Sequence, residues 1–99
     1  MVTRIVKLTF KPEHIDDFLA LFERYKHAIR NAEGCVHLEV LQGTDAPHIF
    51  FTYSHWQEAV YLEKYRQSST FSEVWPLTKA LFLAPAEAWT LNELPVFAD

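Results

Sequence analysis

The segment from His48 to Trp56, HIFFTYSHW, constrains the fold more than any other feature of the chain. Side chains of a β-strand point alternately to opposite faces, so Phe50 and Trp56 share one face, and Phe51 and Tyr53 share the other. A strand that is covered on one side only alternates between apolar and polar residues. Both faces of this segment carry large apolar side chains, and we therefore expect a strand that is buried on both sides.

The remainder of the 99-residue chain offers enough helix to cover one face of such a sheet and hardly enough to cover the other. We therefore expect a second copy of the chain to cover the second face, which predicts a homodimer. A chain of this size buries roughly 60–70% of its unfolded surface. Its length fits a single domain, which we expect to span residues 1–99.

The composition excludes several classes of partner. A hydrophobic fraction of 49% with 15% aromatic residues is ample for a folded core and for a lined pocket. The net charge is −4 and the basic residues are scattered, so nucleic acid is not an expected partner. No apolar run approaches the roughly 20 residues that span a bilayer, and the first residues lack the features of a signal peptide. We expect a cytoplasmic protein with no membrane partner.

The first half of the chain predicts strand, helix and strand in turn. Residues 2–10 alternate as a strand, and only Arg4 interrupts the apolar side. A helix opens at Pro12, carries apolar residues at spacings of three and four, and ends before Gly34. Residues 35–42 form a second strand, in which regular alternation puts Cys35 on the same face as His37. A turn then leads into the strand that ends at Trp56.

The second half predicts a divided helix and a last strand. Residues 57–67 favour a helix, which the sequence Ser68-Ser69-Thr70 interrupts. Thr70 is expected to cap a further helix over residues 71–83, and Pro76 is expected to kink or break it near Trp75.

Residues 86–94 return to strand-like character, and a short tail with Pro95 and Phe97 follows. The resulting order is β-α-β-β-α-β. This order predicts an α+β, ferredoxin-like fold, in which helices cover one face of an antiparallel sheet.

The chain resembles the antibiotic biosynthesis monooxygenase family over nearly all of its length. The segments that carry the resemblance are TRIVKLTFKPE, DDFLALFERYKHAIR, GCVHLEVLQ, FFTYSHW, LEKYRQSSTF, VWPLTKALF and EAWTLNEL. The resemblance implies a homodimer in which two ferredoxin-like sheets pack face to face as a dimeric α/β barrel. It also implies a ligand cavity between the helices and the sheet, and a last strand or tail that reaches towards the partner.

Relatives of this kind oxygenate electron-rich aromatic molecules such as anthrones or quinols with O₂, without a metal or flavin. Others degrade haem, isomerise lactones or act on signalling molecules, so the fold does not settle the reaction. The first hypothesis is a cofactor-independent monooxygenase that acts on a small hydrophobic, phenolic, quinol or polyketide-like ligand. The alternatives are a non-catalytic small-molecule-binding dimer, and an isomerase or signal-degrading enzyme.

The polyketide-oxidising relatives line their cavity with an asparagine, a tryptophan and a tyrosine. By this resemblance Trp56 matches the tryptophan, and its indole N–H is a candidate donor to a substrate oxygen; the alternative is a core tryptophan that anchors the strand to a helix. Thr52 stands four residues earlier, where the asparagine is expected. For the tyrosine, Tyr65 is preferred over Tyr61, although core or surface packing is the favoured interpretation for both. The other candidate substrate-binding residues are Phe22, Phe51, Phe71 and Trp75.

The histidines offer a base and, less directly, a metal site. His37 or His55 is the candidate general base, because imidazole titrates near neutrality. His37, Glu39 and His55 could also form a zinc site, but satisfied polar groups at a dimer face are the preferred interpretation, and no metal is expected.

Haem is not expected either. The haem-degrading relatives use an asparagine on the first strand and an axial histidine on the last helix. The corresponding regions here hold Val6 and Trp75-Pro76, and no histidine lies in residues 71–83, so a haem iron would lack its usual ligand.

Overall fold

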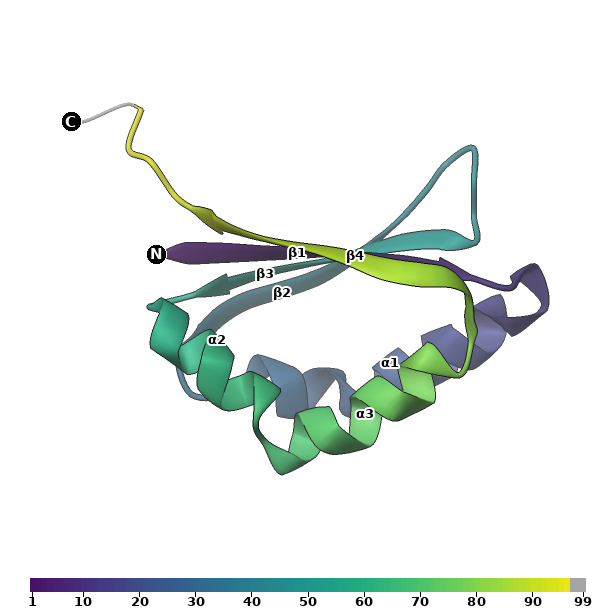
Figure 1. The fold of residues 1–99 in the computed structure, drawn as a ribbon, viewed down its shortest axis with the longest axis horizontal. Coiled ribbons are helices and arrows are strands. Elements are labelled where there is room, and N and C mark those ends of the chain that lie inside the picture. The colour runs from purple at the N-terminus through teal and green to yellow at the C-terminus, as the bar shows by residue number, and fades with distance from the viewer. Residues whose placement is uncertain (97–99) are drawn as a thin grey trace.

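The computed structural model describes residues 1–96. Within this range the elements are β1 Val2–Phe10, the short 3-10 helix η1 Pro12–His14, α1 Ile15–Arg30, β2 Cys35–Gln42, β3 Ile49–Trp56, α2 Ala59–Arg66, α3 Ser69–Lys79 and β4 Phe82–Asn92. The strands form one antiparallel sheet in the order β2-β3-β1-β4. Helices α1, α2 and α3 all lie under the same face of this sheet (Figure 1). The fold is therefore α+β and ferredoxin-like, as the order of elements predicts.

Local sequence explains how α1 begins and ends. Pro12 opens the short helix that precedes it, and Asp16 and Asp17 lie in its first turn, where the helix dipole favours acids. The chain leaves α1 through Gly34, which has a φ of 80°. Only glycine adopts this conformation easily, and a Cβ at this position would also overlap the ring of Tyr61. The turn at Gly34 leads directly into β2, the edge strand that pairs with β3.

A bulge at the start of β2 changes the face of one residue. Cys35 pairs with Trp56, whereas His37 pairs with His55, so the register shifts between Cys35 and His37. This shift turns Cys35 towards the helices, where it is buried beside Trp56 and Leu62. The prediction that Cys35 shares a face with His37 is therefore wrong, because regular alternation does not anticipate a bulge.

The divided helix is confirmed, but its cap differs from the prediction. The hydroxyl oxygen of Ser68 accepts a hydrogen bond from the backbone N–H of Phe71 at 3.2 Å. Ser68 is therefore the N-cap of α3, and the prediction of Thr70 in this role is wrong. The Ser68 side chain is two residues closer to α2, which makes the break between the helices short.

The end of α3 also differs from the prediction. The helix continues through Pro76 to Lys79, and β4 starts at Phe82 rather than at residue 86. Pro76 removes one backbone donor, but the buried neighbours Val74 and Thr78 hold the helix against the core on both sides of it. The predicted break near Trp75 is therefore wrong. In the predicted tail, Phe97 lies outside the described residues.

The main core lies between the sheet and α1. Its buried residues are Leu8, Phe10, Phe18 and Phe50. The rings of Phe10 and Phe18 stack with centroids 4.3 Å apart, and Phe50 meets Phe18 edge-on at 5.0 Å. This aromatic packing fixes the sheet on α1, and Leu8 and Phe18 also line the cavity described below.

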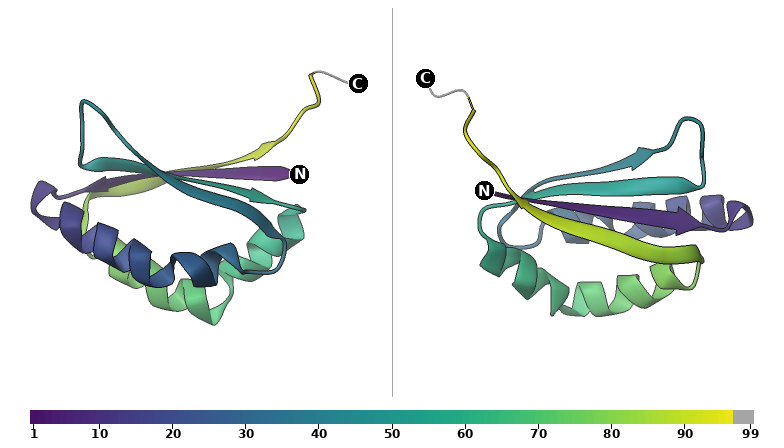
Figure 2. Two further views of the ribbon diagram at one scale, coloured as in Figure 1. Left: turned by 180° about the vertical axis from the view of Figure 1, so that it is seen from behind. Right: turned by 45° about the horizontal axis from the view of Figure 1, so that its top comes forward.

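No described helix covers the opposite face of the sheet (Figure 2). Leu41, Trp89 and Leu91 are 43–49% exposed, and Phe51 and Tyr53 lie between them on β3, partly buried. We call this surface the open sheet face. Among residues 1–96, no helix is long and apolar enough to cross a membrane.

Candidate functional site

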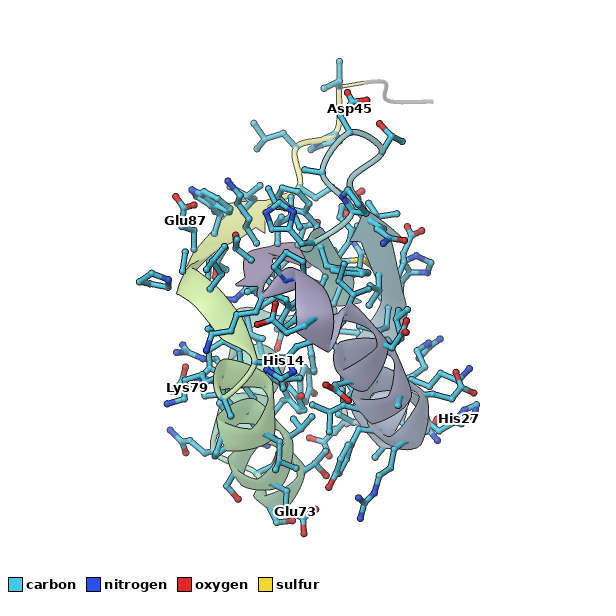
Figure 3. All side chains as sticks on the ribbon, turned by 90° about the vertical axis from the view of Figure 1, so that its right-hand side faces the viewer. His14, His27, Asp45, Glu73, Lys79 and Glu87 are labelled. Atoms are coloured by element: carbon cyan, nitrogen blue, oxygen red, sulfur yellow. The ribbon has the colours of Figure 1, made fainter. Side chains whose placement is uncertain are left out.

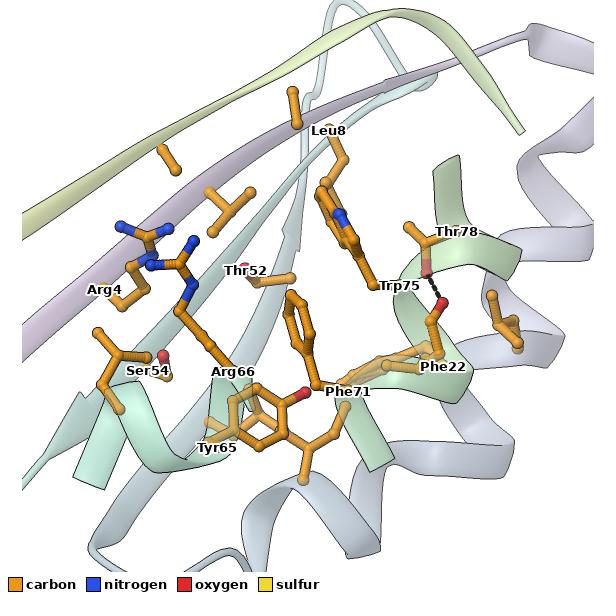
Figure 4. Close-up of a pocket in the computed structure, with 18 of the residues that line it drawn as sticks. Arg4, Leu8, Phe22, Thr52, Ser54, Tyr65, Arg66, Phe71, Trp75 and Thr78 are labelled. Atoms are coloured by element: carbon orange, nitrogen blue, oxygen red, sulfur yellow. Dashed lines mark hydrogen bonds between the residues drawn. The ribbon is translucent and has the colours of Figure 1, made fainter. Parts of the chain in front are cut away.

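A cavity of about 350 Å³ lies between the sheet and the helices. This volume is in the range of pockets that hold small organic molecules. Figure 3 looks along the layer between the sheet and the helices, and Figure 4 shows the side chains that line the cavity. Most of the lining is apolar, and the polar side chains in it are those of Arg4, Thr52, Ser54, Tyr65, Arg66 and Thr78.

Strand alternation determines which residues of the sheet face the cavity. On β1 the residues that face the helices are Arg4, Val6 and Leu8, and their partners on β3 are Ser54, Thr52 and Phe50. The cavity is therefore polar near the start of β1 and apolar near its end. This gradient gives a bound molecule a preferred direction.

The helix side of the cavity is a row of aromatic rings. Tyr65 lies in the last turn of α2 and meets Phe71 edge-on at 5.4 Å, and Phe71 stacks on Trp75 with centroids 5.7 Å apart. Phe22 completes the lining from α1. Because each ring is held by the next, the wall is set before a ligand enters, and it suits a flat aromatic molecule.

Trp56 lies beneath this wall. It is 1% exposed, and its indole N–H donates a hydrogen bond to the hydroxyl oxygen of Ser54 at 3.0 Å. Its ring stacks on Tyr65 with centroids 5.3 Å apart and an interplanar angle of 29°. The indole donor is therefore used inside the protein, and the direct effect of Trp56 on the cavity is to hold the ring of Tyr65.

Tyr65 presents a hydroxyl that stays protonated. Burial, and secondarily the charge of an ionised Cys35, raise the pKa of Tyr65 from 10.0 to about 12. Near neutral pH the phenol is a hydrogen-bond donor and a poor base. Such a group can stabilise negative charge that develops on a substrate oxygen.

Arg4 and Arg66 bring positive charge to the polar end of the cavity (Figure 4). One N–H of the Arg4 guanidinium donates a hydrogen bond to the hydroxyl oxygen of Thr90 at 2.7 Å. Burial and, second, the charge of Arg66 lower the pKa of Arg4, and the negative charge of Glu63 opposes this effect. The two arginines are therefore close enough for their charges to interact.

His37 and His55 lie on the open sheet face, on the other side of the sheet from the cavity. The Nε2 atom of His37 is 3.1 Å from Oε1 of Glu39, and Nδ1 of His55 is 3.1 Å from the hydroxyl oxygen of Thr3. Their rings contact one another and Tyr53. Neither histidine can take a proton from a molecule in the cavity, because the sheet separates them. The hypothesis that one of them is the base is corrected accordingly.

The same three side chains do not make a metal site. In the part of the chain that the structure describes, no group of at least three His, Cys, Asp or Glu residues is arranged to hold a metal ion.

Two more predicted binding residues lie elsewhere. Phe51 is on the open sheet face, because it alternates with Thr52 along β3. Tyr61 packs over Gly34 and against the buried cluster of Cys35 and Trp56, outside the cavity lining. The predicted residues that do line the cavity are Phe22, Thr52, Trp56, Tyr65, Phe71 and Trp75.

The sequence-based site omitted Arg4, Ser54 and Arg66. A signal for Arg4 was present, since it is a cation among the apolar residues of one strand face. Arg66 follows Leu62 by four residues and therefore shares its helix face. Ser54 gave no signal of its own, because a serine in a strand has many possible roles.

Comparisons with known proteins agree with this fold. The chain is similar to a conserved protein from Methanosarcina mazei Go1, at 24% identity and a TM-score of 0.89, covering 95% of this chain and 94% of that one. A putative antibiotic biosynthesis monooxygenase from Deinococcus radiodurans has 17% identity and a TM-score of 0.88, covering 100% and 98%. A mutant of SnoaB, a cofactor-independent oxygenase from Streptomyces nogalater, has 16% identity and a TM-score of 0.83, covering 93% and 91%. At these identities the likeness shows the fold.

Sequence comparison identifies the family. None of the curated protein sequences matches the chain. The sequence model described as antibiotic biosynthesis monooxygenase matches residues 1–75, which hold β1 to β3, α2 and most of α3. Most of the residues that line the cavity fall within this match. The chain therefore belongs to the antibiotic biosynthesis monooxygenase family.

Proposed function

We propose that this protein is a cofactor-independent monooxygenase that oxidises a small phenolic or quinol-like aromatic molecule with O₂. The observation that carries the proposal is the cavity of about 350 Å³, which combines a row of aromatic rings with hydroxyl groups near one end. Membership of the family supports the reaction class, and the match in fold to a cofactor-independent oxygenase supports it further.

In this reaction the substrate must supply all the electrons that reduce O₂. An ionised phenol with a free ring C–H passes electrons to O₂, and a carbon–oxygen bond forms at that carbon. One oxygen atom stays on the ring, which becomes a quinone. The other oxygen leaves as water with the two hydrogens that the substrate loses. No further reductant is required, so the protein has only to bind the anion, stabilise its charge and admit oxygen.

The side chains of the cavity take separate roles in this scheme. The hydroxyls of Tyr65 and Thr52 donate hydrogen bonds to the substrate oxygens, and Trp56 holds the ring of Tyr65 in place. Of residues 1–96, no histidine and no carboxylate lines the cavity. The substrate must therefore be acidic enough to ionise without a side-chain base, which favours phenols and quinols over simple alcohols.

We also propose that the working unit is a homodimer of single-domain subunits that span residues 1–99, in which two open sheet faces pack together as a dimeric α/β barrel. Leu41, Trp89 and Leu91 are 43–49% exposed on this face, and burying them would stabilise the pair. The cavity lies on the helix side of the sheet, so the face that the dimer would bury is not the face that lines the cavity.

The direct experiment is oxygen uptake by the purified, metal-free protein with a panel of anthrones, naphthoquinols and catechols. Tyr65→Phe and Thr52→Val each remove one hydroxyl with little change in shape, and each should lower turnover roughly tenfold, the effect of one hydrogen bond to developing charge. Tyr53→Phe makes the same change on the open sheet face and is the matched control. Uptake that is equal in all four proteins would contradict the assigned roles.

The second candidate is a non-catalytic binding protein or an isomerase on the same fold. Thr52 in place of the asparagine of polyketide-oxidising relatives, together with the absence of a carboxylate or imidazole from the described lining, favours it. A panel member that stabilises the protein against heat but causes no oxygen uptake would support this candidate. Turnover under anaerobic conditions would identify an isomerase.

A further inference from the structure

Arg4 is an unusual residue for its position. It lies on the helix-facing side of β1, directly opposite Ser54 on β3 and Thr90 on β4. On the same strand face Val2 and Leu8 are buried and Val6 is partly buried, and all three are apolar. A guanidinium at this place has given up part of its hydration, and this needs compensation by hydrogen bonds or by negative charge.

The hydrogen bond to Thr90 satisfies only part of the Arg4 guanidinium. This group has five N–H donors, and one of them bonds to the hydroxyl oxygen of Thr90 at 2.7 Å. Among residues 1–96, no carboxylate forms an ion pair with Arg4. The remaining donors therefore have no anionic partner in this part of the chain, and Arg4 lines the cavity.

Arg66 adds a second positive charge at the same end of the cavity. It ends α2, one residue after Tyr65, and lines the cavity together with Arg4 (Figure 4). Its counterion is Glu63, with 3.7 Å between Nη1 and Oε2 and with about half of each side chain exposed. Glu63 also accepts a hydrogen bond from Gln67 at 3.2 Å and does not line the cavity. Such an exposed pair is weak and leaves Arg66 able to bind another anion.

Two like charges at one end of an apolar cavity repel each other. The effect is visible in Arg4, whose pKa is lowered by burial and by the charge of Arg66. A bound anion would reverse this interaction, because each guanidinium would then face a negative oxygen. Guanidinium groups suit this task, since their planar forks match the two oxygens of a carboxylate or the single oxygen of a phenolate.

We propose that Arg4 and Arg66 form an anion-binding site that selects an aromatic substrate with a negatively charged oxygen group, a carboxylate or an ionised phenol. The charged group lies between the two guanidiniums, and the ring extends along the wall of Phe71 and Trp75 towards Leu8. This inference rests on the proposed function in so far as the anion is the molecule that becomes oxidised. It also accounts for ionisation without a side-chain base, because two positive charges lower the pKa of a bound phenol.

The test is a binding titration with three ligands of one shape: hydroxynaphthoate, its methyl ester and its methyl ether. The ester removes the carboxylate charge, and the ether removes the ionisable phenol. Titrations use the full-length protein at low salt under anaerobic conditions, so that no turnover disturbs them. Arg4→Gln and Arg66→Gln are compared with Arg24→Gln, which makes the same change at an exposed position of α1 outside the cavity.

The inference predicts that Arg4→Gln and Arg66→Gln each weaken binding of hydroxynaphthoate roughly tenfold to a hundredfold, the effect of a lost charge-assisted hydrogen bond. Arg24→Gln should bind like the wild type, and Arg4→Lys should recover part of the affinity because it keeps the charge. If the ether keeps this arginine dependence and the ester loses it, the anion is a carboxylate. If the ester keeps it only above the pKa of its phenol, the anion is a phenolate.

Equal affinity of the wild type for all three ligands, or variants that bind as tightly as the wild type, would overturn the inference. Arg66 lies at the exposed end of α2, so Arg66→Gln keeps the test valid even if Arg4→Gln fails to fold. The same experiments distinguish a failure of the proposed function from a failure of the anion site. Arginine-dependent binding without oxygen uptake would support the anion site and reject the oxygenase. Oxygen uptake with neutral quinols that is equal in the wild type and in both variants would support the oxygenase and reject the anion site.

Discussion

The indole nitrogen of Trp56 donates a hydrogen bond to the hydroxyl oxygen of Ser54 at 3.0 Å, within the same strand and beneath the cavity. Both residues are buried, with 1% and 7% of their surfaces exposed. The bond fixes the indole against the ring of Tyr65, 5.3 Å away between centroids. A polar contact inside the core thus helps to fix the position of Tyr65 in the cavity wall.

Ser54→Ala should destabilise the protein by about 1–3 kcal/mol, because the buried indole N–H would lose its acceptor. Thermal unfolding measures this, with an expected fall of about 4–8 °C in Tm for each kcal/mol. Ser72→Ala removes an exposed hydroxyl and should change stability by less than about 0.5 kcal/mol. If the two variants unfold at the same temperature, the Trp56–Ser54 bond contributes nothing to the fold.

Stability should fall above pH 10 through Tyr65. Its pKa is raised from 10.0 to about 12 in the folded protein, so the unfolded chain releases the proton first. Stability from this group is therefore complete below pH 10 and is lost as the pH rises to about 12, by at most about 2–3 kcal/mol. Denaturant unfolding of the wild type and Tyr65→Phe over this pH range isolates the contribution. Parallel curves for the two proteins would show that Tyr65 titrates normally.

Trp89→Glu should convert a dimer into a monomer, because the charge would be buried without a partner between two open sheet faces. Trp89 is 43% exposed there, opposite Ile5 of β1. Leu19→Glu is the matched control, since Leu19 is 44% exposed on α1. Sedimentation equilibrium at micromolar concentration measures the mass of each protein. A wild type that is already monomeric would reject the dimer.

His55→Gln should leave ligand affinity and the pH profile of turnover unchanged, measured at concentrations where the protein is assembled. The sheet separates His55 from the cavity, and its Nδ1 atom contacts Thr3 at 3.1 Å. The same result is expected for His37→Gln. If turnover in either variant no longer changed with pH near neutrality, as it does in the wild type, the substituted histidine would take part in the reaction.

The sequence predicts elements better than it predicts the site. Strands β1 and β2 have the predicted bounds because clean alternation marks them. The face of Cys35 depends on a bulge that arises from pairing with β3, and no pattern within β2 records this pairing. The N-cap of α3 was missed for a related reason, since Ser68, Ser69 and Thr70 are chemically equivalent until the helix path is known.

Errors in the site follow from the same limit. The histidines attract attention by their chemistry, but strand parity puts them on the open sheet face. The cavity instead receives Arg4 and Arg66, which are distant in sequence and meet only when α2 folds under β1. Phe71 and Trp75 do line the cavity, since their spacing of four residues groups them on one face of α3, whereas Phe51 and Tyr61 lie outside the lining.

The most direct test of the account uses isotopically labelled O₂ with the purified, metal-free protein and the panel substrate that binds best. Mass spectrometry then follows the label into the product. The account predicts one labelled oxygen atom in each quinone product, at a rate that depends on the protein and falls in Tyr65→Phe. A product that carries no label, or that forms equally fast without oxygen, would contradict it and make this cavity a binding site or an isomerase site.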